Sequence, residues 1–239
     1  MATFRRILVK LSGEALMAPD GYWLDTQILS SLAEDLAAAT RAGFEIAVVI
    51  GGGNIIRGAR MSAAGWIDRP TADSMGMLGT VMNSLAIETA LNAAGVPART
   101  MSAVSMPTIC ETYARQPALH HLDKGQVVVL AGGTGNPFFT TDTAGALRAV
   151  EIGADAIMKA TKVDGIYSAD PMVHQNAERL AHVTYIEVLN RGLQVMDAAA
   201  ISLCMDNKLP IIVFDLTQAG NIKRIVLGEP VGSIVSSGG

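Results

Sequence analysis

Cysteine, aromatic residues and long hydrophobic runs are scarce in this chain of 239 residues, in which aromatic side chains make up 5%. The two cysteines, Cys110 and Cys204, stand far apart in apolar segments. Such a pair does not indicate a disulfide framework, so we expect a reducing cytoplasm as the compartment. The longest apolar runs, 45–50 and 126–131, have the length of strands, whereas a bilayer-spanning helix needs roughly 20 residues. The first residues do not resemble a signal peptide, and we expect no membrane association.

Clusters of basic residues are missing as well. The net charge is −4, and the longest basic run is the pair Arg5 and Arg6. Proteins that bind nucleic acid usually carry grouped Lys and Arg, so we expect no nucleic-acid partner. A small anionic ligand needs only a few cations and backbone N–H groups, so the composition is compatible with such a ligand.

Two common nucleotide-binding motifs are absent. The sequence has no G-x-x-x-x-G-K-[ST], which excludes a P-loop kinase of the usual nucleoside-monophosphate type, and no G-x-G-x-x-G, which argues against an NAD or flavin enzyme. A protein of this sequence that handles phosphates must therefore use another device.

Strand-length apolar runs alternate with helical segments along the whole chain. This alternation predicts an α/β fold, a three-layer αβα sandwich with a mostly parallel open sheet. We expect strands over 7–11, 45–50, 99–103, 126–131, 154–160, 210–215 and 232–236, and helices over 25–42, 73–94, 143–152, 197–207 and 219–227. Without a repeat or linker, the chain is expected to form one domain, 1–239. Ligands of such sheets lie beyond the carboxyl ends of the strands, where the Gly-rich loops fall here.

Two segments near the N-terminus combine glycine with a cation. In Lys10-Leu11-Ser12-Gly13 a lysine at a strand end stands beside exposed N–H groups, which suits the β- and γ-phosphates of a nucleotide, although a surface lysine fits equally well. Gly51, Gly52 and Gly53, followed by Asn54, separate a strand from an expected helix that carries Arg57. Close strand–helix packing seldom needs three glycines, so we favour a phosphate-binding turn.

The segment 134–142 is the most specific one. It offers neutral hydrogen-bonding groups, the stiff Pro137 and two adjacent phenylalanines, which suits a base and a phosphate held in one loop. Thr140 or Thr141 is expected to cap the next helix. Asp142 is either an N-terminal helix charge or an organiser of the catalytic lysine. Further along, residues 159–171 either contact an adenine nucleotide through Tyr167 and Asp170 or form an ordinary charged hairpin.

Together these segments resemble the bacterial UMP kinases of the amino-acid-kinase family. The matching stretches are 10–16, 51–54 with 57–58, 73 with 75–78, 134–142, 159–171 and 195–197. The lysine and glycine elements are common to amino-acid kinases, whereas Gly-Asn-Pro-Phe-Phe-Thr-Thr-Asp is typical of UMP kinases.

The resemblance implies transfer of the γ-phosphoryl group of Mg-ATP to UMP, giving UDP and ADP in pyrimidine (CTP/UTP) biosynthesis. It implies Mg²⁺ bound with ATP, without identifying protein ligands of the metal, a homohexamer, and inhibition by UTP. The implied catalytic residues are Lys10, Arg57 and Asp142. The implied ATP-binding residues are Lys10, Leu11, Ser12, Gly13, Gly53, Arg57, Thr161, Tyr167 and Asp170. The implied UMP-binding residues are Gly52, Asp73, Thr134, Gly135, Asn136, Pro137, Phe138, Phe139, Thr140 and Thr141.

Two places depart from that family. Trp23 stands in a loop where many members have a glycine, and Glu88 and Asn92 stand where GTP-activated relatives tend to carry basic residues. Activation by GTP is therefore expected to be weak or absent. The alternatives considered are an amino-acid kinase acting on a carboxylate such as acetylglutamate, and a nucleotide-binding protein without catalysis. Asp73 with Phe138-Phe139 argues against the first, and Lys10, Arg57 and Asp142 together argue against the second.

Overall fold

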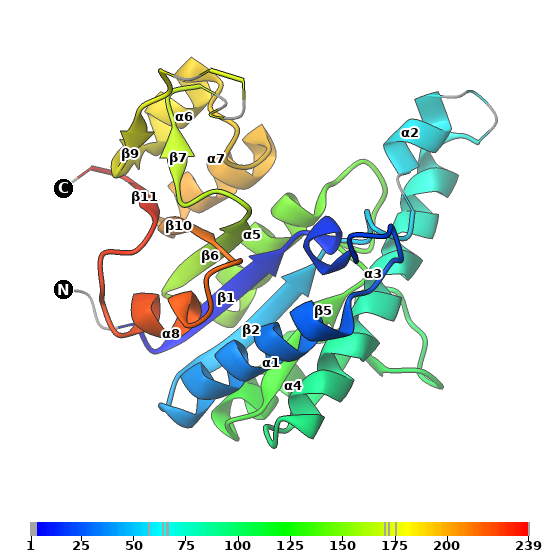
Figure 1. Ribbon diagram of the computed structural model, residues 1–239. Coiled ribbons are helices and arrows are strands. Elements are labelled where there is room, and N and C mark those ends of the chain that lie inside the picture. Colours follow the sequence, from blue (N-terminus) through cyan, green and yellow to red (C-terminus); the bar gives the residue numbers. More distant parts are fainter. Residues whose placement is uncertain are drawn as a thin grey trace.

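A computed structural model describes residues 4–56, 58–63, 65, 67–169, 171, 173–174 and 176–238 (Figure 1). Arg57 and Asp170, two of the expected nucleotide-binding residues, lie outside this part. Within it, no helix is long and apolar enough to cross a membrane.

A large open sheet forms the centre of the molecule. Its strands lie in the order β4-β3-β5-β2-β1-β6-β10-β11-β9, and its neighbours are parallel except for the antiparallel pair β10 and β11. The strands of this sheet are β1 (Arg6–Leu11), β2 (Glu45–Ile50), β3 (Ala98–Ser102), β4 (Glu111–Thr112), β5 (Val127–Ala131), β6 (Ala156–Thr161), β9 (His182–Thr184), β10 (Ile211–Asp215) and β11 (Ser233–Ser236). A separate short pair consists of β7 (Ile166–Tyr167) and β8 (Arg179–Leu180). The predicted mostly parallel α/β sheet is confirmed.

Helices cover both faces of the sheet. They are the 3-10 helix η1 (Gly13–Leu16) and the α-helices α1 (Thr26–Arg41), α2 (Gly58–Ala63), α3 (Arg69–Ala93), α4 (Arg115–Asp123), α5 (Thr141–Ile152), α6 (Tyr185–Arg191), α7 (Ala198–Asp206) and α8 (Asn221–Val226). Residues of α1, α3 and α8 pack with Ile7 and Val9 in one hydrophobic cluster, whereas residues of α4 to α7 pack with Leu8 in another. Because side chains alternate along a strand, β1 contributes to both layers. Figure 1 shows α1 and α8 in front of the sheet and α5 behind it.

Caps explain where the helices begin. Asp25 caps α1 as expected, because its carboxylate accepts the N–H groups of Gln27 and Ile28. The expected start of the 73–94 helix is wrong: Asp68 accepts the Thr71 N–H at 2.7 Å, so α3 begins at Arg69. The helix expected directly after the three glycines begins only at Gly58. The helix α4 within the polar segment 113–125, and the short elements β8, β9 and α6, were not predicted.

Candidate active site

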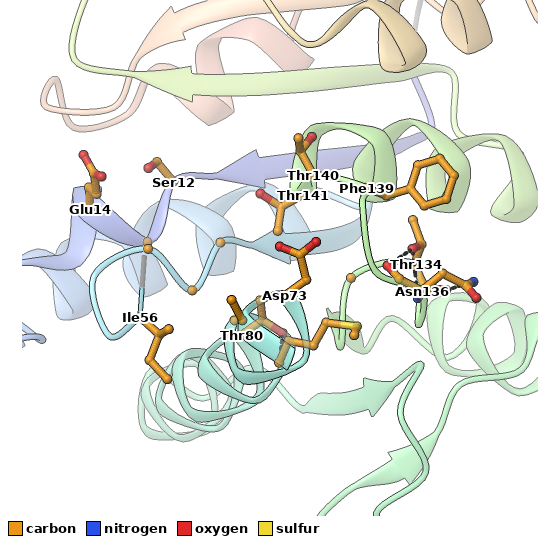
Figure 2. A pocket seen from close by; sticks show the side chains of 18 of the residues that line it. Ser12, Glu14, Ile56, Asp73, Thr80, Thr134, Asn136, Phe139, Thr140 and Thr141 are labelled. Carbon is orange, nitrogen blue, oxygen red and sulfur yellow. Dashed lines mark hydrogen bonds between the residues drawn. The ribbon is translucent and has the colours of Figure 1, made fainter. Parts of the chain in front are cut away.

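A cavity of about 490 Å³ opens at the carboxyl ends of β1, β2 and β5 (Figure 2). Its walls come from the start of η1, the glycine turn after β2, the first half of α3 and the loop between β5 and α5 (residues 132–140, the β5–α5 loop). The lining residues are Ser12, Gly13, Glu14, Gly51, Gly52, Gly53, Ile56, Arg69, Ala72, Asp73, Gly76, Met77, Thr80, Gly133, Thr134, Asn136, Phe139, Thr140 and Thr141. Four segments far apart in the sequence thus share one cavity.

Most of the residues expected to bind UMP lie on this cavity. Its wall contains Gly52, Asp73, Thr134, Asn136, Phe139, Thr140 and Thr141, together with Ser12, Gly13 and Gly53 from the expected ATP-phosphate turns. Gly135, Pro137 and Phe138 belong to the same loop without lining the cavity. Leu11 has a fully buried side chain, which leaves only its backbone for a ligand.

Thr161 and Tyr167, the two expected adenine-side residues that the structure describes, do not line this cavity. Thr161 ends β6 and lines a second cavity of about 740 Å³, bordered by η1, α1 and the end of β10. The Tyr167 hydroxyl donates a hydrogen bond to Asp164 at 2.7 Å in the short β7–β8 hairpin. The strand that pairs with β7 begins at Arg179, beyond the segment 159–171 in which a charged hairpin was considered.

The glycine turns are needed for close packing as well as for open backbone. A Cβ at Gly52 would lie 2.5 Å from the carbonyl oxygen of Gly76 in α3, and a Cβ at Gly13 would lie 2.5 Å from that of Gly51. At Gly53, in contrast, the nearest atoms to such a Cβ are 3.8 Å away, in the side chain of Glu14. Strand–helix packing, considered above as the alternative, therefore explains Gly52, whereas Gly53 keeps room beside its backbone.

Helix α3 connects the two turns through buried polar side chains. The Asn83 side chain, which is fully buried, donates to the Gly51 carbonyl at 2.7 Å and pairs with the Asn54 amide. One turn earlier, the Thr80 hydroxyl accepts the Gly132 N–H at 2.7 Å. A single rigid helix thus sets the distance between the turn after β2 and the turn after β5.

The β5–α5 loop is anchored at both ends. Thr140 caps α5, because its hydroxyl accepts the N–H groups of Asp142 and Thr143 at 3.1 and 3.3 Å. Phe138 adopts a left-handed backbone (φ 73°), which is costly for a residue other than glycine, and its N–H donates to Asp73 at 2.8 Å. The phenylalanine rings remain largely exposed, at 64% for Phe138 and 52% for Phe139. Figure 2 shows the Asp73 carboxylate directed from α3 toward Thr141.

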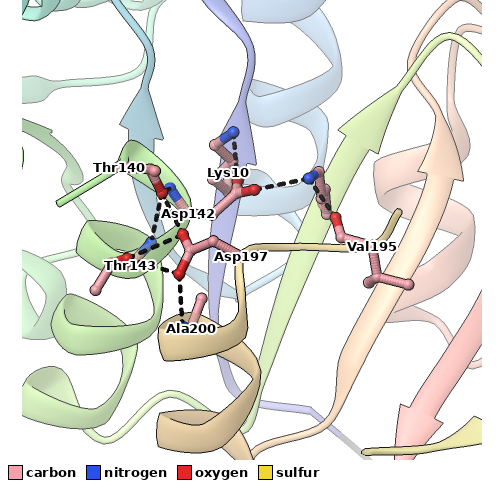
Figure 3. Close-up of polar contacts among 8 residues, drawn as sticks. Lys10, Thr140, Asp142, Thr143, Val195, Asp197 and Ala200 are labelled. Carbon is pink, nitrogen blue, oxygen red and sulfur yellow. Dashed lines mark hydrogen bonds and ion pairs between the residues drawn. The ribbon is translucent and has the colours of Figure 1, made fainter. Parts of the chain in front are cut away.

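Beside the cavity, Asp142 bridges two lysines (Figure 3). Lys10 in β1 and Lys159 in β6 are register partners on neighbouring strands, and their Nζ atoms lie 2.5 and 2.9 Å from the two carboxylate oxygens of Asp142. Lys159 also donates to the carbonyl of Val195. The three charged side chains are 8 to 17% exposed. This geometry favours the organiser reading of Asp142 over a mere helix charge.

Burial and charge act in opposite directions within this group. Burial alone raises the pKa of Asp142, but the ammonium groups of Lys10 and Lys159 outweigh it, so the pKa lies below its ordinary value of 3.8. For Lys159 burial is the larger effect, and its pKa lies below the ordinary 10.5 although the Asp142 carboxylate opposes the shift. Lys159 was missed from the sequence as a site residue. Its available signal was a lysine at the end of a buried strand, the same signal that Lys10 carries.

Asp197, like Lys159, was not predicted as a site residue; it appeared only within the stretch 195–197 that resembles the UMP kinases. Its carboxylate caps α7 by accepting the Ala200 N–H at 3.0 Å, and it also accepts the hydroxyl groups of Thr143, at 2.9 Å, and Thr140. The N-termini of α5 and α7 are therefore joined through one carboxylate, next to the Lys159–Val195 contact.

Two largely buried cations at the carboxyl edge of a parallel sheet lie near glycine turns and a cavity, an arrangement that suits a phosphorylated ligand. The chain belongs to the amino acid kinase family, because the sequence model of that family matches residues 5–215. The cavity lies at the carboxyl ends of parallel strands, where open α/β sheets bind their ligands.

Solved structures narrow the resemblance within that family. UMP kinase from Bacillus anthracis is 38% identical with a TM-score of 0.94, over 98% of this chain and 97% of that chain. UMP kinase from Ureaplasma parvum is 33% identical with a TM-score of 0.91, over 99% and 100% of the two chains. Uridylate kinase from Archaeoglobus fulgidus is 26% identical with a TM-score of 0.74, over 96% and 99%. The predicted resemblance to bacterial UMP kinases is confirmed.

Proposed function

We propose that this protein is a UMP kinase, which transfers the γ-phosphoryl group of ATP to UMP and so serves pyrimidine nucleotide synthesis. The observation that carries the proposal is the Lys10–Asp142–Lys159 group beside a cavity lined by Asp73 and the β5–α5 loop. Cations next to an acceptor cavity are what phosphoryl transfer requires, because catalysis of this reaction is mostly positioning and charge stabilisation.

The transfer is direct, without a covalent enzyme intermediate. The attacking atom is a phosphate oxygen of UMP, which is already ionised near neutral pH because the second pKa of a phosphate monoester is about 6. A general base is therefore unnecessary. Lys10, Lys159 and Arg57 neutralise the charge that develops on the transferring group, and Asp142 holds the first two in place.

The nucleotide sites divide between the two halves of the sheet edge. Ser12, Gly13 and Gly53, with the Leu11 backbone, hold the ATP phosphates, and Thr161, Tyr167 and Asp170 contact the adenine nucleotide. UMP occupies the cavity, with its ribose at Asp73 and its base at the β5–α5 loop. The same cavity provides the place where UTP would inhibit.

Mg²⁺ is proposed to arrive with ATP. Among the described residues no group of three or more His, Cys, Asp or Glu side chains could hold a metal ion, and both Asp142 oxygens already face lysines. These residues do not form a protein cage, which fits an ion held mainly by phosphates and water. When bound, the ion supplies charge neutralisation between the β- and γ-phosphates.

UMP should be strongly preferred over CMP and dUMP as acceptor. The base meets neutral Asn and Thr groups, and Asp73 is available for the ribose hydroxyls. We would measure ADP release in a coupled assay with UMP, CMP, dUMP and acetylglutamate at matched concentrations. Equal rates with UMP and CMP would contradict the assignment of base recognition to residues 134–141, and a preference for acetylglutamate would overturn the proposed function itself.

Activation by GTP should be weak or absent. Glu88 accepts the Thr100 N–H at 2.9 Å and lies 3.6 Å from the Arg99 guanidinium, which also lies 3.7 Å from the carboxylate of Glu111. A polyanionic effector would meet two carboxylates around that cation, which converts attraction into repulsion. The measurement is initial velocity at subsaturating UMP and fixed Mg-ATP, with and without GTP. A several-fold rise would show that other residues provide the effector's cations.

We also propose that the chain assembles into homohexamers in the cytoplasm. Leu78 and Met82 are each 48% exposed on one face of α3, an i,i+4 spacing that gives a second copy an apolar contact surface. Cys110 and Cys204 are free thiols, which suits a reducing compartment. Sedimentation velocity would establish the assembly size, and a monomer at micromolar concentration would contradict it.

A further inference from the structure

Arg69 is the one cationic side chain among the cavity-lining residues that the structure describes. It is the first residue of α3, one helical turn before Asp73. Its Nε lies 2.8 Å from each oxygen of the Asp73 carboxylate. Arg69 and Asp73 thus form an i,i+4 ion pair, and because both residues lie on α3 this contact does not depend on the conformation of a loop.

We propose that Arg69 is a positioning residue that sets sugar specificity by aiming the Asp73 carboxylate at the acceptor's ribose. The inference rests on the proposed function, because it needs a nucleoside monophosphate in the cavity. It assigns Arg69 an effect on the 2′-hydroxyl rather than on the phosphate.

The Asp73 carboxylate has capacity for both neighbours and a ligand. Oδ1 receives the Arg69 Nε, and Oδ2 receives the same Nε and the Phe138 N–H. An ionised carboxylate accepts roughly four hydrogen bonds, so a ribose hydroxyl can still be accommodated. The side chain of Asp73 is only 15% exposed, so its orientation depends on these two partners and not on bulk water.

Losing Arg69 would leave Asp73 with one described partner, the N–H of the strained residue Phe138. The carboxylate would then follow the β5–α5 loop instead of α3, and the fixed geometry that distinguishes a ribose from a deoxyribose would be lost. The helix itself should survive, because Asp68 still caps it and the Arg69 side chain is 42% exposed.

The test compares kcat/KM for UMP and dUMP in the wild type and in Arg69→Met, Arg69→Lys and Asp73→Asn. Arg69→Met should lower the UMP/dUMP selectivity about tenfold, the size of one well-oriented charged hydrogen bond, mainly through KM for UMP. Arg69→Lys should restore part of it, because the charge returns without the planar fork. In the Asp73→Asn background, Arg69→Met should change the selectivity no further, since the two residues act as one unit.

Arg224→Met provides the matched control. Arg224 is a similarly exposed arginine, 50%, paired with Glu229 at 2.6 Å on α8 and remote from the cavity lining. It should leave the selectivity unchanged. If kcat/KM in Arg69→Met fell equally for UMP and dUMP, Arg69 would act on the phosphate, and if kcat/KM stayed at the wild-type value for both, Asp73 would need no support; either result overturns the inference. A wild type that does not phosphorylate UMP would instead refute the proposed function.

Discussion

Lys10→Ala is expected to lower kcat about 10²–10³-fold while leaving KM for UMP nearly unchanged. Lys10 lies at the end of β1 with its Nζ 2.5 Å from Asp142, next to the cavity wall formed by Ser12 and Gly13. Its ammonium group neutralises the negative charge that develops on the phosphoryl group during transfer. This interaction is stronger during transfer than in the complex with bound substrates. The loss should therefore appear in turnover and not in acceptor binding.

The variant should still fold, because Asp142 retains Lys159 as an ion-pair partner at 2.9 Å. Circular dichroism and thermal unfolding would establish this before the kinetics are interpreted. Lys124→Ala, an exposed lysine just after α4, is the matched control and should keep wild-type turnover. A Lys10→Ala enzyme that keeps most of its kcat would remove Lys10 from the proposed mechanism.

Asp142→Asn should reduce both activity and stability. The amide cannot neutralise Lys10 and Lys159, whose buried ammonium groups would face each other without a shared anion. Breaking a buried ion pair by removing one partner typically costs about 3–5 kcal/mol, and we expect a loss at the lower end because the asparagine keeps the shape. Urea unfolding at neutral pH would measure it, and kcat should fall with it because both lysines lose their fixed positions.

The stability difference between the wild type and Asp142→Asn should also change with pH, in a direction that the pKa of Asp142 determines. The pKa of Asp142 in the folded protein lies below 3.8, so its stabilising contribution is complete above that value and is lost as the pH falls through the lowered pKa. The stability difference between the wild type and Asp142→Asn should therefore shrink in strong acid. Burial lowers the pKa of Lys159 and Asp142 opposes that, so the variant's activity should also fall at a less alkaline pH than the wild type's. Equal stability at neutral pH would contradict the organising role of Asp142.

Short-range signals in the sequence predicted several features correctly. Asp25 was placed as a helix cap, the strand 45–50 was given its observed bounds, and Thr140 was one of two expected caps for α5. The β5–α5 loop was recognised from residues that follow one another directly. Each of these depends on contacts within a few residues, such as the Asp25 carboxylate with the N–H groups of Gln27 and Ile28.

The start of α3 was less well predicted. The helix was expected over 73–94, and this start was wrong because Asp68 accepts the Thr71 N–H and Pro70 fits the first turn. The difference matters for function. It places Asp73 one turn inside the helix, where Arg69 can reach its carboxylate.

The sequence by itself determined the α/β class, the positions of the glycine turns and the residues of the β5–α5 loop, because local spacing and backbone chemistry decide these. Only the tertiary structure decided that Lys159 stands beside Lys10, since the two lysines lie on different strands and become neighbours only because β6 pairs with β1 in the register that places Lys10 opposite Lys159. It also decided that Gly52 must be glycine because α3 packs against it, and that Asp197 joins Thr140 to α7. These contacts depend on strand order and helix packing, which bring together residues whose separation along the chain carries no local signal.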